Sequence, residues 1–150
     1  MLEALVSLGT MAAMAFLSAT ILPFPSEAVF AGLLARGEVQ ALALFVTATV
    51  FNTLGSVSNW WIGRLAASGH LARLPERLRP GPETLAKAEA LFARFGWLAL
   101  LLSWVPGIGD LGTLAAGLLR YRLLPFILLV GIGKASRYAA IWAGWIAITG

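Results

Sequence analysis

Apolar residues form four long blocks along the chain, and half of the charged residues lie between the second and the third block. The blocks cover residues 4–35, 39–63, 95–119 and 123–150. A helix that crosses a membrane needs about 20 mostly apolar residues. The second and fourth blocks therefore predict two membrane-spanning helices.

The first and third blocks are interrupted by residues that end helices, and each interruption lies beside a single acidic residue. The first contains Pro23, Pro25, Ser26 and Glu27, and the second contains Pro106, Gly107, Gly109 and Asp110. Proline removes a backbone donor and clashes with the preceding turn, so each helix should end there. The third block then holds two half-helices of about ten residues, roughly half a bilayer each, which predicts a re-entrant hairpin. Residues 4–22 either span the membrane or form half of a second hairpin.

The chain also resembles itself around the two interruptions. Residues 31–34 recur at 116–119 as Ala-Gly-Leu-Leu, and residues 55–60 parallel residues 133–138. A unit made of one hairpin and one span crosses the membrane an odd number of times, so the second unit must be inverted relative to the first. Broken backbone must avoid lipid, so the two breaks should face each other or a cavity. We therefore predict an all-α membrane protein with two re-entrant broken-helix hairpins, transmembrane helices and an inverted repeat.

A polar segment separates the two predicted repeats. The expected domain is a single integral membrane unit over residues 1–150, with repeats over about 4–64 and 95–150. Between residues 64 and 94 the sequence carries six Lys or Arg residues against three Glu, which predicts a cytoplasmic loop. The apolar residues of 82–95 fall near one helical face, so we expect an amphipathic helix on the membrane surface.

Composition supports lipid as the solvent. Hydrophobic residues make up 59% of the chain and charged residues 12%, whereas soluble domains carry about 25% charged residues. The net charge of +4 comes from basic residues between apolar blocks, which indicates lipid headgroups rather than nucleic acid. Cysteine is absent and His70 is the only histidine, so no metal site or cofactor is expected. No nucleophile–base set is visible, and we predict that the protein is not an enzyme.

Glu27 and Asp110 are the strongest candidates for chemistry. A carboxylate at membrane depth is costly, so it indicates a functional site. Burial raises the pKa of a carboxyl group and a helix N-terminus lowers it, which suits proton exchange. The alternative is that each acid only begins its half-helix. For one acid the two interpretations are even, but two acids at matching points of a repeat favour function.

Lys134 and Arg137 lie in the middle of the last apolar block, three residues apart and therefore on one helical face. They either neutralise the two acids as buried pairs or bind an anion, since an arginine fork matches phosphate geometry. Both interpretations hold together if a substrate competes with the carboxylates for the cations. Asn59 either lines the same cavity or forms an interhelical hydrogen bond. Tryptophans near span ends, among them Trp60, are interpreted as membrane-interface residues.

Several of these motifs occur together in a known family. They are residues 17–20, the Pro-Ser-Glu break, Gly55 with Asn59 and Gly63-Arg64, residues 101–106 with Gly109-Asp110, and Gly133-Lys134-Ala135 with Arg137-Tyr138. From about residue 17 to residue 142 the chain resembles the DedA family, also called the SNARE-associated or VTT-domain family, and its short YqaA-like branch. The resemblance implies two facing re-entrant hairpins, with Glu27 and Asp110 in acidic roles and Arg137 with Lys134 in basic ones.

Members of the wider family are linked to proton-dependent transport and to moving undecaprenyl phosphate or other phospholipids. The chain departs from longer members, because it lacks their extra helices and their arginine pattern around the second hairpin.

These features predict a transporter or flippase of a lipid phosphate in the bacterial inner membrane, coupled to protons. The expected proton-coupling residues are Glu27 and Asp110, and the candidate substrate contacts are Lys134, Arg137, Ser26 and Asn59. Expected partners are membrane lipids, an anionic lipid headgroup and protons, and a homodimer is one way for a short chain to enclose a pathway. The alternatives are a small-molecule or cation/proton antiporter and a non-transporting scaffold whose charges are structural.

Overall fold

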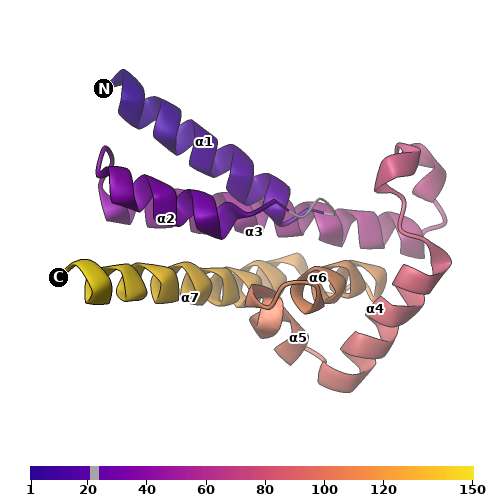
Figure 1. The fold of residues 1–150 in the computed structure, drawn as a ribbon. Coiled ribbons are helices and arrows are strands. Elements are labelled where there is room, and N and C mark those ends of the chain that lie inside the picture. Colours follow the sequence, from indigo (N-terminus) through magenta and orange to yellow (C-terminus); the bar gives the residue numbers. More distant parts are fainter. Residues whose placement is uncertain (21–23) are drawn as a thin grey trace. The chain divides into compact units, whose positions relative to one another are not determined.

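The computed structural model describes residues 1–20 and 24–150, and within them the regular structure is helical, with no strand (Figure 1). Pro23, predicted in the first break, lies outside the described residues. The helices are α1 (Leu2–Ser18), α2 (Ser26–Arg36), α3 (Ala41–Ala67), η1 (Leu71–Arg73), η2 (Glu76–Leu78), α4 (Pro82–Phe95), α5 (Leu98–Leu101), η3 (Leu102–Trp104), α6 (Ile108–Leu118) and α7 (Leu123–Thr149).

Helices α3 and α7 are the two long ones, with 27 residues each. By length and composition both can cross a membrane, as the second and fourth apolar blocks predict. The described residues form two compact units, and each long helix contributes to both. The first unit is Met1–Gly55 with Lys134–Gly150, and the second is Ser56–Gly133.

The predicted helix breaks are present where the structure describes them. Helix α2 begins at Ser26, directly after Pro25, and α6 begins after Val105, Pro106 and Gly107. Gly107 has a φ of 81°, a left-handed conformation that favours glycine. Gly109, predicted to be part of the second break, instead lies in the first turn of α6. There it packs directly against the backbone of Ser103. A side chain at this position would prevent α6 from folding back along η3, so the close contact requires glycine.

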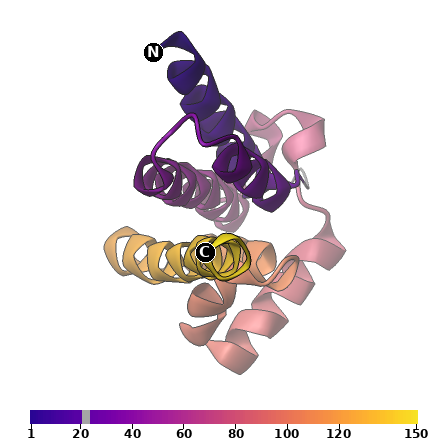
Figure 2. The same cartoon turned by 60° about the vertical axis from the view of Figure 1, so that its left-hand side comes forward.

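The first unit is built from α1, α2, the start of α3 and the end of α7. Helix α2 runs back along α1, and a short connection then returns the chain into α3 (Figures 1 and 2). Apolar side chains from all four helices meet in one core, which includes Met11, Phe30, Leu44 and Tyr138. The burial of these side chains holds the start of α2 beside α7, where the candidate site lies.

The connection between α2 and α3 is tied to α1 by Glu38. Its carboxylate accepts hydrogen bonds from Arg36 Nε at 2.9 Å and from Ser7 Oγ at 3.0 Å. The hydrogen bond from Arg36, followed by the one from Ser7, lowers the pKa of Glu38, so its carboxyl group is ionised at neutral pH. Arg36 and Glu38 therefore form an ion pair at the opposite end of α2 from Glu27.

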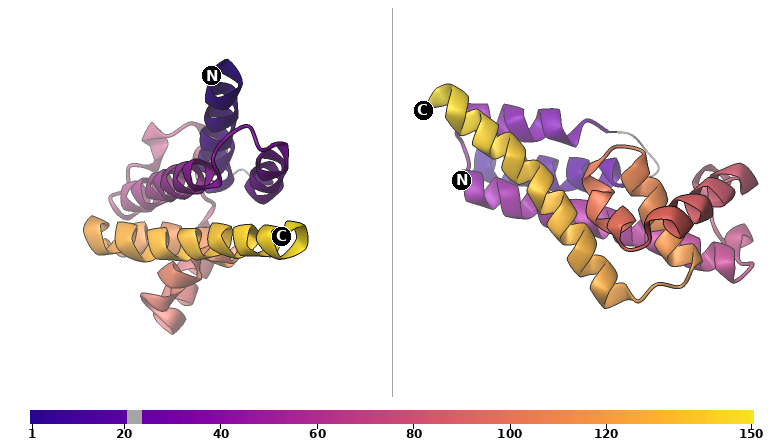
Figure 3. Two further views of the ribbon diagram at one scale, coloured as in Figure 1. Left: turned by 90° about the vertical axis from the view of Figure 1, so that its left-hand side faces the viewer. Right: turned by 90° about the horizontal axis from the view of Figure 1, so that it is seen from below.

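The second unit contains α4, α5, η3, α6, the end of α3 and the start of α7. Helix α4 packs against α6, and α5 with η3 folds back on α6 (Figure 3). The apolar side chains of α4, including Leu85 and Ala88, pack on Ile62 and Leu114. The helix predicted over 82–95 is therefore confirmed, but its apolar face is covered by protein rather than free to lie on the membrane.

The environment of Trp60 differs from the membrane interface that the sequence predicts for it. Its side chain is only 5% exposed, and Nε1 donates a hydrogen bond to the carbonyl oxygen of Tyr121 at 3.0 Å. Trp60 is thus a core residue and not a membrane-interface residue, whereas the neighbouring Trp61 is exposed. The reason is the tight contact between α3 and α6, where the backbone of Trp60 lies against Gly117.

Candidate functional site

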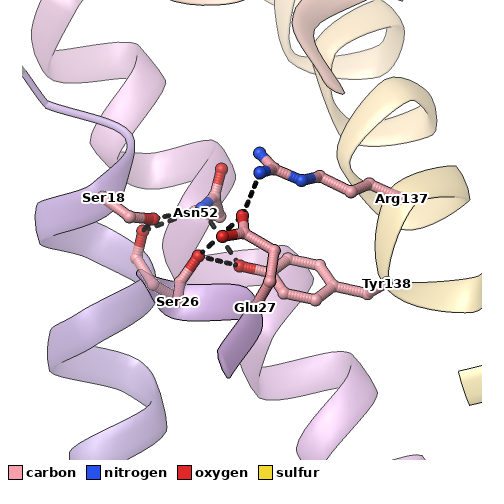
Figure 4. Close-up of polar contacts among 7 residues, drawn as sticks. Ser18, Ser26, Glu27, Asn52, Arg137 and Tyr138 are labelled. Atoms are coloured by element: carbon pink, nitrogen blue, oxygen red, sulfur yellow. Dashed lines mark hydrogen bonds and ion pairs between the residues drawn. The ribbon is translucent and has the colours of Figure 1, made fainter. Parts of the chain in front are cut away.

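An ion pair joins the broken end of α2 to the middle of α7. Pro25 ends the preceding segment, so Ser26 and Glu27 occupy the first turn of α2. A carboxylate there is favoured by the partial positive charge of the helix N-terminus. Arg137 Nη2 pairs with Glu27 Oε1, and the side chains are 22% and 31% exposed, respectively (Figure 4). The pair is therefore partly desolvated and partly accessible to solvent.

A chain of neutral hydrogen bonds leads to the same carboxylate (Figure 4). Ser26 Oγ donates to Glu27 Oε1 at 3.2 Å, and Tyr138 Oη donates to Ser26 Oγ at 3.0 Å. Asn52 Nδ2 lies 3.1 Å from Tyr138 Oη and 2.8 Å from Ser18 Oγ. Four separate helices, α1, α2, α3 and α7, thus supply one polar network inside an apolar unit.

Packing fixes the position of this network. Tyr138, Ser26 and Asn52 are almost fully buried, and the ring of Tyr138 lies 5.2 Å from that of Phe30. Because buried polar groups are costly unless they are hydrogen-bonded, the network specifies one arrangement of the four helices. Ser26 was predicted as a substrate contact, but its hydroxyl is engaged within this network.

Lys134 lies one helical turn before Arg137 on α7 and is 2% exposed. The predicted spacing of three is thus present, but the two cations differ in environment. Arg137 is the more accessible of the two, so it is the better placed to meet a ligand that enters from outside the unit.

The second unit holds the other predicted site residues. Asp110 lies half-buried in the first turn of α6, after the N-cap Gly107. Asn59 Nδ2 donates to Thr113 Oγ1 at 3.3 Å, and Thr113 Oγ1 donates to the carbonyl oxygen of Asp110 at 2.8 Å. Asn59 therefore forms an interhelical hydrogen bond, which is one of its two predicted roles.

The N-caps of α2 and α6 are Pro25 and Gly107, so neither Glu27 nor Asp110 is itself an N-cap.

Sequence reasoning missed Tyr138 and Ser18 as members of the site. Tyr138 was visible only as the repeat partner of Trp60 and as part of a family motif, and Ser18 only as part of a family motif. The available signal was that a tyrosine and an arginine are neighbours in an otherwise apolar block. No group of three or more His, Cys, Asp or Glu residues suited to a metal ion occurs in the part of the chain that the structure describes.

The fold and the site define a helical membrane protein with an ion pair between a broken helix and a membrane-compatible helix. The chain belongs to the VTT-domain family, which is also called the DedA family, because the model of the VTT domain matches residues 22–144. It is 39% identical to the inner membrane protein YqaA of Escherichia coli over 97% of this chain and 95% of that protein. This supports the predicted family and a place in a bacterial inner membrane.

Two further relatives match most of the chain. An uncharacterized protein of Haemophilus influenzae is 40% identical over 85% of this chain and 80% of its own length. The undecaprenyl phosphate transporter A of Staphylococcus aureus is 29% identical over 75% of this chain and 60% of its own length. No solved structure matches the chain.

Proposed function

We propose that the protein moves a lipid phosphate across the bacterial inner membrane and that protons drive the movement. The observation that carries this proposal is the partly exposed ion pair between Glu27 on α2 and Arg137 on α7, a membrane-compatible helix. The name of the S. aureus relative, an undecaprenyl phosphate transporter, supports the same class of substrate.

The chemistry of the pair accounts for both substrate and proton. An arginine guanidinium binds phosphate through two parallel hydrogen bonds, so Arg137 is the headgroup ligand. In the structure the carboxylate of Glu27 pairs with that guanidinium. Protonation of Glu27 removes its charge and frees Arg137 for phosphate, while the tail of the lipid stays in the membrane. Proton uptake and phosphate binding are then linked through one side chain.

Two re-entrant hairpins in an inverted repeat complete the proposal, and the packing of each unit supports it. Each unit contains one broken helix pair, the start of one long helix and the end of the other. Gly55 of α3 packs on the backbone of Phe16, just before the first break, and Gly133 of α7 packs on Leu101, just before the second. Phe16 and Leu101 are separated by the same 85 positions as the repeated Ala-Gly-Leu-Leu motifs, at 31–34 and 116–119.

Reconstitution in liposomes tests the proposal. With an imposed pH gradient, we expect wild-type protein to move a fluorescent polyprenyl phosphate, and Glu27→Gln and Asp110→Asn to lose the response to the gradient. The amides keep the size of the acids but cannot exchange a proton. Glu38→Gln is the matched control, because it removes a carboxylate from the other ion pair of α2 and should leave the response intact.

Each outcome of this experiment is informative. A full gradient response in both Glu27→Gln and Asp110→Asn would end the proton-coupling part of the proposal. If Asp110 only neutralises a buried cation, Asp110→Asn should instead lose about 3 kcal/mol of stability, which a thermal assay on the same preparation detects. Uptake of inorganic phosphate alone would make free phosphate the substrate. Exchange of cations for protons without lipid movement would indicate an antiporter.

A separate prediction concerns the side of the membrane on which the polar segment lies. The basic residues between 64 and 94 predict a cytoplasmic location for it. The chain has no cysteine, so a single cysteine at the exposed position His70 reports on this segment alone. In intact cells an impermeant thiol reagent should leave it unlabelled, and permeabilised cells should label fully. Ready labelling in intact cells would reverse the orientation.

A further inference from the structure

The start of α2 is attached to α7 at two adjacent points of different chemistry. Glu27 pairs with Arg137, and the preceding residue, Ser26, accepts a hydrogen bond from the following residue, Tyr138. The first attachment depends on the charge of Glu27 and on whether Arg137 is bound to an anion. The second is neutral and almost fully buried, so neither protonation of Glu27 nor binding of an anion to Arg137 removes it.

The direction of the hydrogen bonds indicates what the neutral attachment does. Tyr138 donates to Ser26, and Ser26 donates to Glu27, so both hydroxyl groups point toward the carboxylate. On its far side Tyr138 Oη meets Asn52 Nδ2, which also lies 3.0 Å from the carbonyl oxygen of Ala15. An amide N–H is not an acid that passes protons on, so the chain ends at Asn52. This arrangement holds groups in place and does not conduct protons.

We infer that Tyr138 is a positioning residue that keeps the start of α2 on α7 while the Glu27–Arg137 pair is open. The inference rests on the proposed function in one respect, because the proposed function explains why the ion pair opens. With Tyr138 in place, Glu27 stays beside Arg137 and can close the pair again after the phosphate leaves. Without it, opening the pair would free the broken end of α2 from the long helix.

The charges around Glu27 are consistent with this division of roles. From α7 it faces Arg137 and Tyr138, with Lys134 one turn away. From α1 and α3 the network contributes Ser18 and Asn52, which carry no charge. Among these described contacts, the ion pair is therefore the charged attachment and Tyr138 supplies the neutral one.

Distance measurements between two spin labels test the inference without any transport assay. Ala28 on α2 and Ala140 on α7 are exposed and belong to the same unit, and the absence of native cysteine allows both to be labelled cleanly. We expect one narrow distance peak in wild type, in Glu27→Gln and in Tyr138→Phe, because each variant retains one attachment. Combining Glu27→Gln with Tyr138→Phe should abolish the narrow peak.

The controls separate positioning from packing. Tyr138→Phe keeps the ring against Phe30, so a pure packing role predicts a narrow peak in the double variant as well. Tyr121→Phe, at the other tyrosine of the chain, should have no effect when combined with Glu27→Gln. If the double variant does not fold, Ser26→Ala with Glu27→Gln removes the acceptor of the same hydrogen bond and should give the same loss.

Three results would overturn the inference. A narrow peak in both double variants would show that the neutral attachment is not needed. A broad distribution in Tyr138→Phe alone would mean that the ion pair cannot hold α2 by itself. A broad distribution in Glu27→Gln alone would mean that the hydrogen bond of Tyr138 cannot hold α2 by itself. None of these results depends on whether the protein transports lipid phosphate, so failure of the proposed function is detected separately.

Discussion

Replacing Arg137 by Gln is expected to reduce the movement of lipid phosphate roughly 30-fold, through a loss of about 2 kcal/mol of headgroup binding. The guanidinium supplies two donors in a rigid fork and a permanent charge, and glutamine supplies neither the fork nor the charge. Because the side chain of Arg137 is largely shielded from water, its contact with phosphate is weakened little by solvent. The measurement is the initial rate of transfer in proteoliposomes at matched protein density.

Arg36→Gln is the matched control for this substitution. Arg36 also pairs with a carboxylate, that of Glu38 at 2.6 Å, and it lies on the same helix as Glu27. Its side chain is 62% exposed, so solvent screens its charge, and transfer should stay near the wild-type rate. Equal losses in Arg36→Gln and Arg137→Gln would point to a general electrostatic effect of the first unit rather than to a headgroup ligand.

Local chemistry allowed the helix breaks to be predicted. Pro25, Pro106 and Gly107 act on their own backbone, through a fixed φ, a missing donor or a left-handed conformation, and these effects need no partner. The two long apolar helices were predictable for the same reason, since span length depends only on the local sequence. The boundary at Gly109 was placed wrongly because its role is contact with Ser103, a residue on another element.

The candidate site was predicted in its residues but not in its connections. Charge in an apolar block singled out Glu27 and Arg137, yet nothing in the sequence specified which acid would meet which cation. Tyr138 was missed because its hydroxyl matters only when Ser26 and Asn52 are brought to it from two other helices. Most of its surface is apolar, so its neighbour Arg137 is the sign of such a role that the sequence offers.

The amphipathic pattern of α4 and the tryptophan at position 60 show a related difficulty. In a membrane protein an apolar side chain is suited to lipid and to a protein core alike, so the pattern does not distinguish them. Leu85 and Ala88 face protein, and Trp60 is buried while Trp61 is exposed. What decides between the two environments is how closely helices approach, and that depends on the smallest residues at the contact.

The largest effect on stability is expected at such a contact, from Gly117→Ala. A Cβ at Gly117 would overlap the backbone of Trp60, so α3 and α6 would have to separate. On the α3 side of the contact, a Cβ at Gly63 would likewise overlap the backbone of Leu114, so the two helices have no room to adjust. Overpacking costs about 1–3 kcal/mol in well-packed cores. Because backbone rather than a flexible side chain must move, we expect a loss at the upper end of that range or beyond.

Gly32→Ala is a control that the sequence itself provides. Gly32 occupies the same place in the first Ala-Gly-Leu-Leu motif as Gly117 in the second, but a Cβ there would meet no neighbouring element within 4 Å. Alanine favours a helix by up to about 1 kcal/mol over glycine, so Gly32→Ala should match or exceed wild-type stability. Thermal unfolding of both variants in the same detergent measures the difference. If the two substitutions shift the unfolding temperature alike, close packing of α3 on α6 is not what selects glycine at position 117.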